Sequence, residues 1–246
     1  MQIFITGATG FLGKNLIRRL QEIPSVSILT FDRQENLTQL NSKIKNADFI
    51  FHLAAVHRPI DPIEFVNVNQ DLTRNILESL RYVDNHSPVL YTSSAQALDD
   101  TDYGRSKMVA ETLLIEHSQR LRSQVIIMRL NNVFGRWAQP NHHSVVATWC
   151  YNIARGIPIR IDNPNCIMKL CYVDDVMDQF LASIFGEVSK RGGYMEVNEG
   201  LIYEIALKDI ASTLYAIYEN RFRLDVDDPK YSVKVKLLST YLSYVP

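Results

Sequence analysis

The stretch IFITGATGFLG, residues 3–13, decides the fold of this chain of 246 residues. Its first three residues form a short apolar run typical of a buried strand, and from Phe11 onward apolar residues recur at helical spacing. Gly7, Gly10 and Gly13 therefore stand on a turn from strand to helix. Glycines at such a turn allow a phosphate group to approach the free N–H groups at the helix N-terminus. The stretch predicts a site for the pyrophosphate of a dinucleotide.

Short apolar runs alternate with amphipathic stretches in the residues that follow. Continuous apolar strands that alternate with helices indicate a parallel sheet covered on both faces. We therefore predict an α/β fold with a Rossmann-type doubly wound parallel sheet. The apolar runs lie at residues 26–31, 49–53, 89–92 and 125–128, and the helical patterns at residues 11–23, 36–45, 65–80 and 103–121.

The alternation of apolar runs with amphipathic stretches becomes irregular beyond Gly135. We therefore predict that the chain has two parts. Residues 1–135 form the NAD(P)-binding Rossmann core, to which residues 173–197 return. Residues 136–172 and 198–246 form a small C-terminal substrate-binding lobe. Its predicted elements are a helix over 145–154, a strand over 157–161 and a helix over 207–218.

Composition excludes several classes of protein. The hydrophobic fraction of 46% and charged fraction of 22% are typical of a globular domain. With 26 Lys and Arg against 27 Asp and Glu, no excess of positive charge favours nucleic acid or an anionic membrane. No apolar run approaches the roughly 18 residues of a membrane span, and no secretory signal precedes the first strand. The three cysteines and the pair His142–His143 lack metal-ligand spacing. We expect a cytoplasmic protein without a metal site.

Asp32 and Arg33 stand at the end of the second predicted strand, where a side chain that reads the adenosine ribose is expected. Asp32 could accept a hydrogen bond from a 2′-hydroxyl, as in NAD(H). Arg33 could instead clamp the 2′-phosphate of NADP(H). These two residues leave both cofactors open.

Tyr103 and Lys107 are four residues apart on a predicted helix, so both project from one face. The preceding apolar strand ends in Ser93 and Ser94, where a Rossmann sheet delivers residues to the cofactor. Reduction of a ketone by hydride creates an alkoxide that must be protonated, and a nearby cation would let a tyrosine do so near neutrality. We predict Tyr103 as proton donor, Lys107 as the cation that lowers its pKa, and Ser94 as hydrogen-bond donor to the carbonyl oxygen. Ser93 is the alternative, because successive strand residues face opposite sides.

Several motifs resemble those of the extended short-chain dehydrogenase/reductases that act on nucleotide sugars. They are the glycine pattern of residues 7–13, His52–Ala55, Asn67–Val68, Arg129–Gly135 and Tyr172–Asp175. The resemblance implies an NAD(P)-dependent enzyme that is a homodimer. It also implies a set of cofactor-binding residues: Gly7, Gly10, Phe11, Leu12, Gly13, Asp32, Arg33, Leu53, Ala54, Ala55 and Lys107.

Residues 52–59, 103–107, 140–148 and 239–246 resemble more closely the reductase domains of bifunctional enzymes of capsular polysaccharide synthesis, in which a metal-binding cupin domain follows. This resemblance implies NADPH-dependent reduction of the C4 ketone of a UDP-linked 2-acetamido-2,6-dideoxy-hexos-4-ulose, a surface polysaccharide precursor. Asn132, Arg136 and His142 are then candidate contacts to the nucleotide sugar. Two alternatives stay open: a nucleotide-sugar 4-epimerase with tightly bound NAD, and a non-catalytic NAD(P)-binding module.

Overall fold

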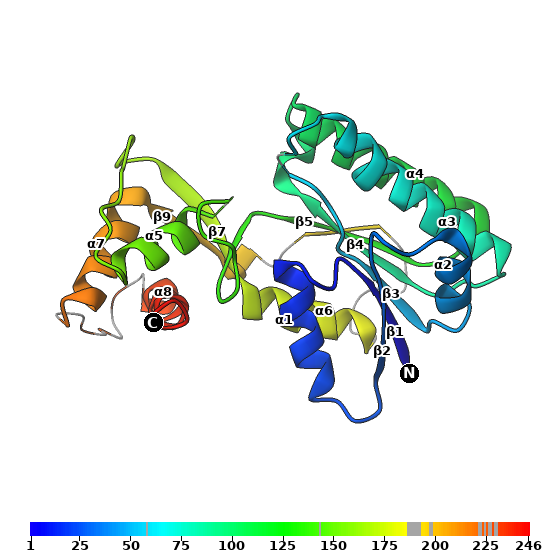
Figure 1. Ribbon diagram of the computed structural model, residues 1–246, viewed down its shortest axis with the longest axis horizontal. Helices are drawn as coiled ribbons and strands as arrows, with labels where there is room; N and C mark the ends of the chain where they lie inside the picture. Colours follow the sequence, from blue (N-terminus) through cyan, green and yellow to red (C-terminus); the bar gives the residue numbers. More distant parts are fainter. Residues whose placement is uncertain are drawn as a thin grey trace. The chain divides into compact units, whose positions relative to one another are not determined.

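A computed structural model describes residues 1–57, 59–142, 144–185, 193–196, 199–220, 223, 225, 228 and 231–246 (Figure 1). The chain forms two compact units. The first unit comprises Met1–Leu130 and Met177–Val197, and the second comprises Asn131–Val176 and Asn198–Pro246. Within the described residues, no helix is both long and apolar enough to cross a membrane.

The first unit contains a six-stranded parallel sheet in the order β2-β1-β3-β4-β5-β8. From β1 the chain moves to β2 on one side and then to β3 on the other, so the winding direction reverses between β1 and β3. In such sheets, ligands bind outside the carboxyl ends of the strands at this switch point. The strands are β1 (Gln2–Thr6), β2 (Ser27–Phe31), β3 (Phe49–His52), β4 (Val89–Ser94), β5 (Val125–Leu130) and β8 (Gly193–Glu196).

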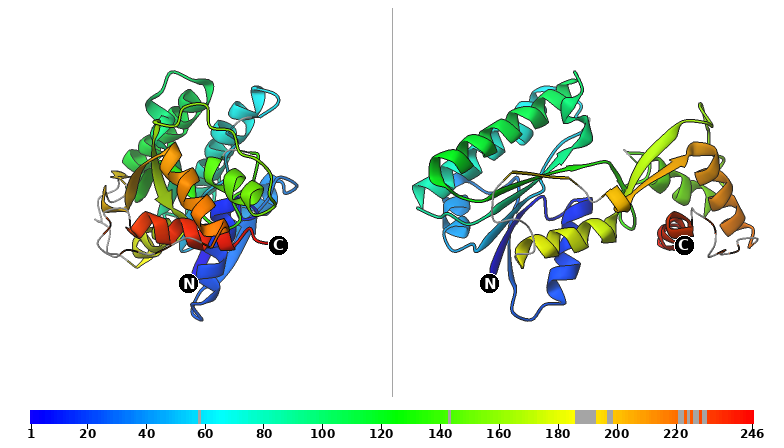
Figure 2. Two further views of the ribbon diagram at one scale, coloured as in Figure 1. Left: turned by 90° about the vertical axis from the view of Figure 1, so that its left-hand side faces the viewer. Right: turned by 180° about the vertical axis from the view of Figure 1, so that it is seen from behind.

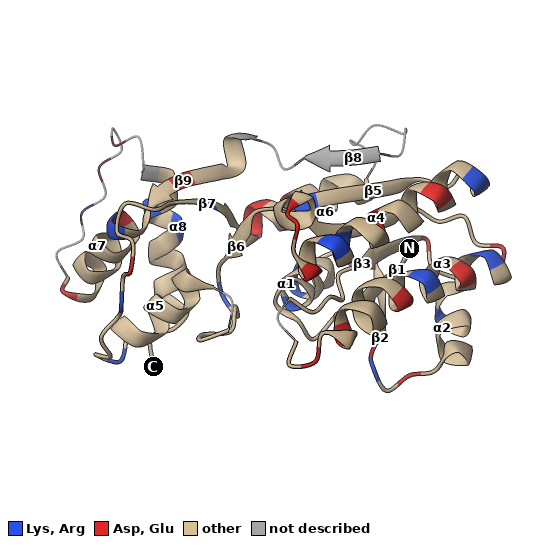
Figure 3. Ribbon diagram, turned by 90° about the horizontal axis from the view of Figure 1, so that it is seen from above, with Lys and Arg blue, Asp and Glu red and all other residues tan. Residues whose placement is uncertain are grey.

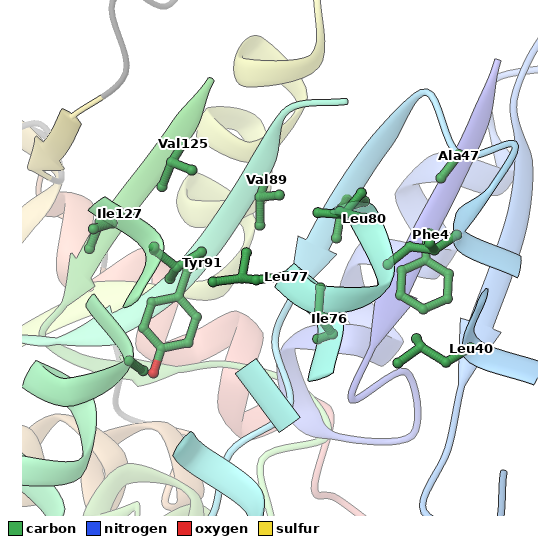
Figure 4. Close-up of a cluster of buried hydrophobic side chains, with 14 residues drawn as sticks. Phe4, Leu40, Ala47, Ile76, Leu77, Leu80, Val89, Tyr91, Val125 and Ile127 are labelled. Atoms are coloured by element: carbon green, nitrogen blue, oxygen red, sulfur yellow. The ribbon is translucent and has the colours of Figure 1, made fainter. Parts of the chain in front are cut away.

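Helices cover both faces of this sheet (Figures 1 and 2). Phe4 points into a buried cluster formed with the helices α2, α3 and α4 (Figure 4). On the opposite face, the ring of Phe51 lies 5.4 Å from that of Phe180 in α6. The predicted doubly wound fold is confirmed. The helices are α1 (Phe11–Gln21), α2 (Leu37–Ile44), α3 (Leu72–Tyr82), α4 (Asp102–Leu121) and α6 (Val173–Ile184), and a wider π-helical segment, η1 (Phe65–Asp71), leads into α3.

Acidic and basic residues are interspersed along α3 and α4 (Figure 3). Pairs such as Arg81 with Glu78 and Arg74 with Asp71 lie three residues apart on the same helix face. Opposite charges at this spacing support a helix modestly and leave its outer face in water.

The second unit is built on a three-stranded mixed sheet in the order β6-β7-β9, in which β6 runs parallel and β9 antiparallel to β7. The helices α5, α7 and α8 pack on one another. The elements are β6 (Asn132–Phe134), α5 (Val145–Ile153), β7 (Ile167–Tyr172), β9 (Ile202–Ala206), α7 (Leu207–Tyr218) and α8 (Tyr231–Leu242).

The predicted strand over 157–161 is wrong, because these residues form no strand. α5 ends at Ile153, Gly156 adopts φ +67° shortly after it, and the Ile157 N–H turns back to bond the carbonyl of Asn152. Pro158 then removes a donor that a ladder would need. The strand of this region is β7, whose alternation is weak because its last three residues are all buried.

Candidate active site

The glycine turn lies at the switch point between β1 and β3. Gly7 adopts φ +72°, and a Cβ there would lie 2.7 Å from the backbone nitrogen of Ala54. A Cβ on Gly13 would lie 2.2 Å from the carbonyl oxygen of Gly7. Gly10 is the N-cap of α1 and carries no capping side chain, so the first N–H groups of the helix are left for a ligand. Gly7, Gly10 and Gly13, together with the free N–H groups at the start of α1, form a glycine cradle. This cradle fits the pyrophosphate of a dinucleotide.

His52 joins the strand ends under this cradle. Its Nδ1 and Nε2 atoms each lie 2.8 Å from a threonine hydroxyl, those of Thr6 and Thr73 respectively. Thr73 donates its own hydrogen to the carbonyl of Asn69, so His52 Nε2 must donate and Nδ1 must accept. Burial, and then the charge of Lys107, lower the pKa of His52 to about 3. His52 is therefore a neutral structural link.

Asn69 connects the segment after β3 to α4. Its carboxamide accepts the Val56 N–H at 2.9 Å, donates to the Val56 carbonyl at 3.0 Å and donates to Ser106 Oγ at 2.9 Å. Ser106 in turn donates to the carbonyl of Tyr103 at 2.8 Å. The motif resemblance pointed instead to Asn67, which is exposed. The wider turns of η1 change which residues face inward, so a pattern of helical spacing does not select Asn69.

The predicted ribose-reading residues lie at the carboxyl end of β2. Asp32 Oδ1 accepts the backbone N–H of Gln34 at 3.0 Å. The side chain of Arg33 is 74% exposed and lies 4.0 Å from Glu64. On the neighbouring β3 side, Leu53 is buried, Ala54 half-buried and Ala55 exposed.

Ser94, Tyr103 and Lys107 come together at the carboxyl end of β4. Ser94 ends the strand, and Tyr103 and Lys107 lie on the first two turns of α4, which Thr101 caps. Tyr103 shares a hydrogen bond with Ser94. The buried Lys107 Nζ lies 5.9 Å from the centre of the Tyr103 ring and donates to the carbonyl of Thr92 at 2.9 Å.

The Ser93 hydroxyl bonds Glu111 rather than Tyr103. It donates to Glu111 Oε1 at 2.5 Å, and Glu111 also accepts Arg129 Nε at 2.9 Å and Nη2 at 2.6 Å. Ser94 Oγ instead accepts the Gln96 N–H and stays on the Tyr103 side. The geometry favours Ser94 over Ser93 as the serine that meets a ligand.

The sequence predicts that Lys107 lowers the pKa of Tyr103. In the structure the pKa of Tyr103 is raised instead. Burial raises the pKa of Tyr103, opposed by the hydrogen bond with Ser94. Burial lowers the pKa of Lys107 to about 7, against the charge of Glu111, which raises it. The ammonium hydrogen-bonds the backbone of Thr92 rather than the phenol.

His57 is a further residue at this site to which the sequence assigned no role. Its ring centre lies 4.2 Å from that of Tyr103, and its Nε2 lies 3.1 Å from Gln96 Oε1. The ring centre of Phe65 lies 6.3 Å from that of Tyr103. These rings restrict the rotation of the Tyr103 side chain.

The candidate substrate contacts belong to the second unit. Asn132 Nδ2 donates to the carbonyl of Lys169 at 3.3 Å, and the exposed His142 lies in the loop before α5. Arg136 pairs with Asp174 at 2.6 Å and lies 5.4 Å from the Trp137 ring. His143 is outside the described residues.

A doubly wound sheet with a glycine cradle at its switch point defines a nucleotide-binding protein of the Rossmann type. The sequence pattern of the NAD dependent epimerase/dehydratase family matches residues 3–191. The chain belongs to this family, which confirms the resemblance drawn from its motifs.

Two proteins are similar to this chain over its whole length. UDP-2-acetamido-2,6-beta-L-arabino-hexul-4-ose reductase of Pseudomonas aeruginosa is 39% identical over 246 residues, which cover the whole of this chain and 65% of the relative. The capsular polysaccharide assembling protein CapF of Staphylococcus aureus has a crystal structure that matches with a TM-score of 0.85 and 34% identity, covering 100% of this chain and 65% of CapF. This chain thus spans less than two thirds of the length of either.

A more distant structure shares the fold alone. UDP-glucuronic acid 4-epimerase of Bacillus cereus, in complex with NAD, matches with a TM-score of 0.84 and 17% identity. The match covers 100% of this chain and 96% of that one.

Proposed function

We propose that this chain reduces the C4 ketone of a UDP-linked 2-acetamido-2,6-dideoxy-hexos-4-ulose in the synthesis of a surface polysaccharide precursor. The observation that carries the proposal is the grouping of Ser94, Tyr103 and Lys107 in the unit that holds the glycine cradle. The Pseudomonas aeruginosa reductase, 39% identical over the whole chain, supports this choice of substrate.

The three side chains have complementary tasks in this proposal. Ser94 accepts the Gln96 N–H, and its one hydroxyl hydrogen, which bonds the Tyr103 phenol in the structure, would turn to the substrate carbonyl when the sugar binds. Tyr103 gives its phenol proton to the alkoxide oxygen that forms when hydride adds to C4. Lys107, whose ammonium donates to the carbonyl of Thr92, has further N–H donors for the ribose hydroxyls of the nucleotide. Gly7–Gly13 and Leu53–Ala55 would hold a reduced nicotinamide dinucleotide, which would supply the hydride when bound.

NADPH is the proposed hydride donor. Asp32 uses a carboxylate oxygen for the Gln34 N–H, whereas the Arg33 side chain is 74% exposed, so that a 2′-phosphate would meet a guanidinium. We expect kcat/KM to be higher with NADPH than with NADH, and Arg33→Ala to remove the difference. An equal loss with both cofactors would contradict this assignment.

The remaining proposals rest on the family resemblance. Asn132, Arg136 and His142 are the proposed contacts to the nucleotide sugar. The protein is proposed to work as a homodimer in the cytoplasm, a reducing compartment that suits its free thiols at Cys150, Cys166 and Cys171.

The deciding experiment follows the loss of reduced-nicotinamide absorbance when NADPH and the UDP-linked keto sugar are mixed with the protein. We expect turnover, and a kcat about 10²–10⁴-fold lower for Tyr103→Phe. Tyr82→Phe is the matched control, because Tyr82 is 80% exposed on α3. Interconversion of 4-epimers by protein that retains its nucleotide through gel filtration would instead identify an epimerase. Nucleotide binding without turnover would identify a non-catalytic module.

A further inference from the structure

Glu111 is a fully buried carboxylate outside the set of residues assigned above. It lies on α4, four residues after Lys107, and its side chain is 0% exposed. Three donors converge on it: Ser93 Oγ, Arg129 Nε and Arg129 Nη2, at 2.5, 2.9 and 2.6 Å. A group that only accepts hydrogen bonds in this way is an ionised carboxylate.

The sheet holds this charge in place through two neighbouring strands. Ser93 of β4 and Arg129 of β5 are partners in the parallel ladder, so both reach the same carboxylate from adjacent positions. The Arg129 side chain is 23% exposed, so the pair lies at the edge of the interior. The fold therefore stabilises a negative charge one helical turn beyond Lys107.

Lys107 is held close to Glu111 without forming an ion pair with it. Its hydrogen bond goes to the carbonyl of Thr92, the residue before Ser93, so adjacent residues of β4 hold the ammonium and the carboxylate separately. An ammonium carries three donors, and this bond uses one of them. The carboxylate can thus stabilise the positive charge while leaving other N–H groups of Lys107 to a ligand.

We propose that Glu111 is a positioning residue for the proposed reduction: its carboxylate, fixed by Ser93 and Arg129, keeps Lys107 in the ammonium form at the site. The role of Glu111 in the reduction rests on the proposed function. The electrostatic link between the two side chains can be tested without catalysis.

The other groups around Lys107 keep one charge state near neutral pH. The Tyr91 ring lies 4.6 Å from Nζ, and burial raises the pKa of this tyrosine well above 10. Burial, together with the charge of Lys107, lowers the pKa of His52 to about 3. Tyr103, at 5.9 Å, has its pKa raised by burial. Of these four groups, Lys107 is the one with a pKa near neutrality, at about 7, and the charge of Glu111 raises it.

The test is an NMR titration of ¹³C-labelled lysine, with Lys107 assigned by its loss in Lys107→Met. We expect a midpoint near pH 7 in the wild type. In Glu111→Gln we expect it to fall by about one pH unit, because an opposite charge is removed. Ser93→Ala, which keeps the charge and removes one hydrogen bond, should leave it nearly unchanged. A midpoint in Glu111→Gln equal to that of the wild type overturns the proposal.

Activity provides the second measurement. The alkaline limb of kcat/KM should move to lower pH in Glu111→Gln and return in Glu111→Asp, whereas a merely structural role would reduce activity equally at every pH. If Glu111→Gln does not fold, the double variant Glu111→Leu/Arg129→Leu replaces the pair by apolar groups and should show the same direction of shift. Absence of reductase activity in the wild type, together with the expected NMR shift, refutes the proposed function and leaves the link between Glu111 and Lys107 standing.

Discussion

Replacing Asn69 by alanine should destabilise the first unit strongly. The side chain is 1% exposed and makes three hydrogen bonds, two with the backbone of Val56 and one with Ser106. At about 1 kcal/mol each, their loss lowers the free energy of unfolding by about 3 kcal/mol. For a unit of this size, that corresponds to a fall in Tm of about 6–12 °C.

Urea unfolding of wild type, Asn69→Ala and Asn67→Ala measures this difference. Asn67→Ala is a matched control two residues away, because Asn67 is exposed and an exposed substitution changes stability by about 0.5 kcal/mol or less. We also expect a lower kcat in Asn69→Ala, since Ser106 links Asn69 to the backbone of Tyr103. Equal unfolding free energies for the two variants would refute the assignment of Asn69 as the connection between β3 and α4.

Three further outcomes follow from the site. Gly13→Ala should abolish nucleotide binding in a fluorescence titration, since its Cβ would lie 2.2 Å from the Gly7 oxygen; binding at wild-type affinity would disprove the cradle. Ser94→Ala should lower kcat by about 10²–10³-fold through loss of the carbonyl donor, whereas Ser93→Ala should act mainly on stability, and the reverse result would exchange their roles. Burial lowers the pKa of Lys107 to about 7 from 10.5, so between these values the unfolded chain binds the extra proton and stability rises with pH, by about 1.4 kcal/mol per pH unit. Lys107→Met should lack this component when unfolding is measured by urea across that range, and identical pH slopes would contradict it.

Periodicity was sufficient where an element has a uniform environment. In the first unit β1, β3 and β4 are buried on both faces, and α4 buries residues at regular helical spacing, so their positions could be predicted within a few residues. In the second unit, β7 has exposed residues at its start and three buried residues at its end, and the apolar residues after Gly156 lie beside a proline. Apolar content alone therefore selected residues 157–161 instead.

The residues of the candidate site could also be predicted only in part. Spacing on a regular helix was enough to bring Tyr103 and Lys107 together, and chain order was enough to place Ser94 beside them. Asn69 lies on a π-helical segment, where the spacing rule does not hold. Glu111 and His57 act through partners distant in the chain, Arg129 and Tyr103, and no local pattern predicts such contacts.

The hydrogen bonds through His52 have a single direction, from the Ala54 N–H through Thr6, His52 and Thr73 to the carbonyl of Asn69. None of these donors can reverse, because the chain starts at an N–H group and ends at a backbone oxygen. The floor of the nucleotide cradle is thus preorganised in one arrangement, and binding loses little conformational entropy there. Affinity for the cofactor should accordingly depend more on how fast it leaves than on any slow rearrangement before it enters.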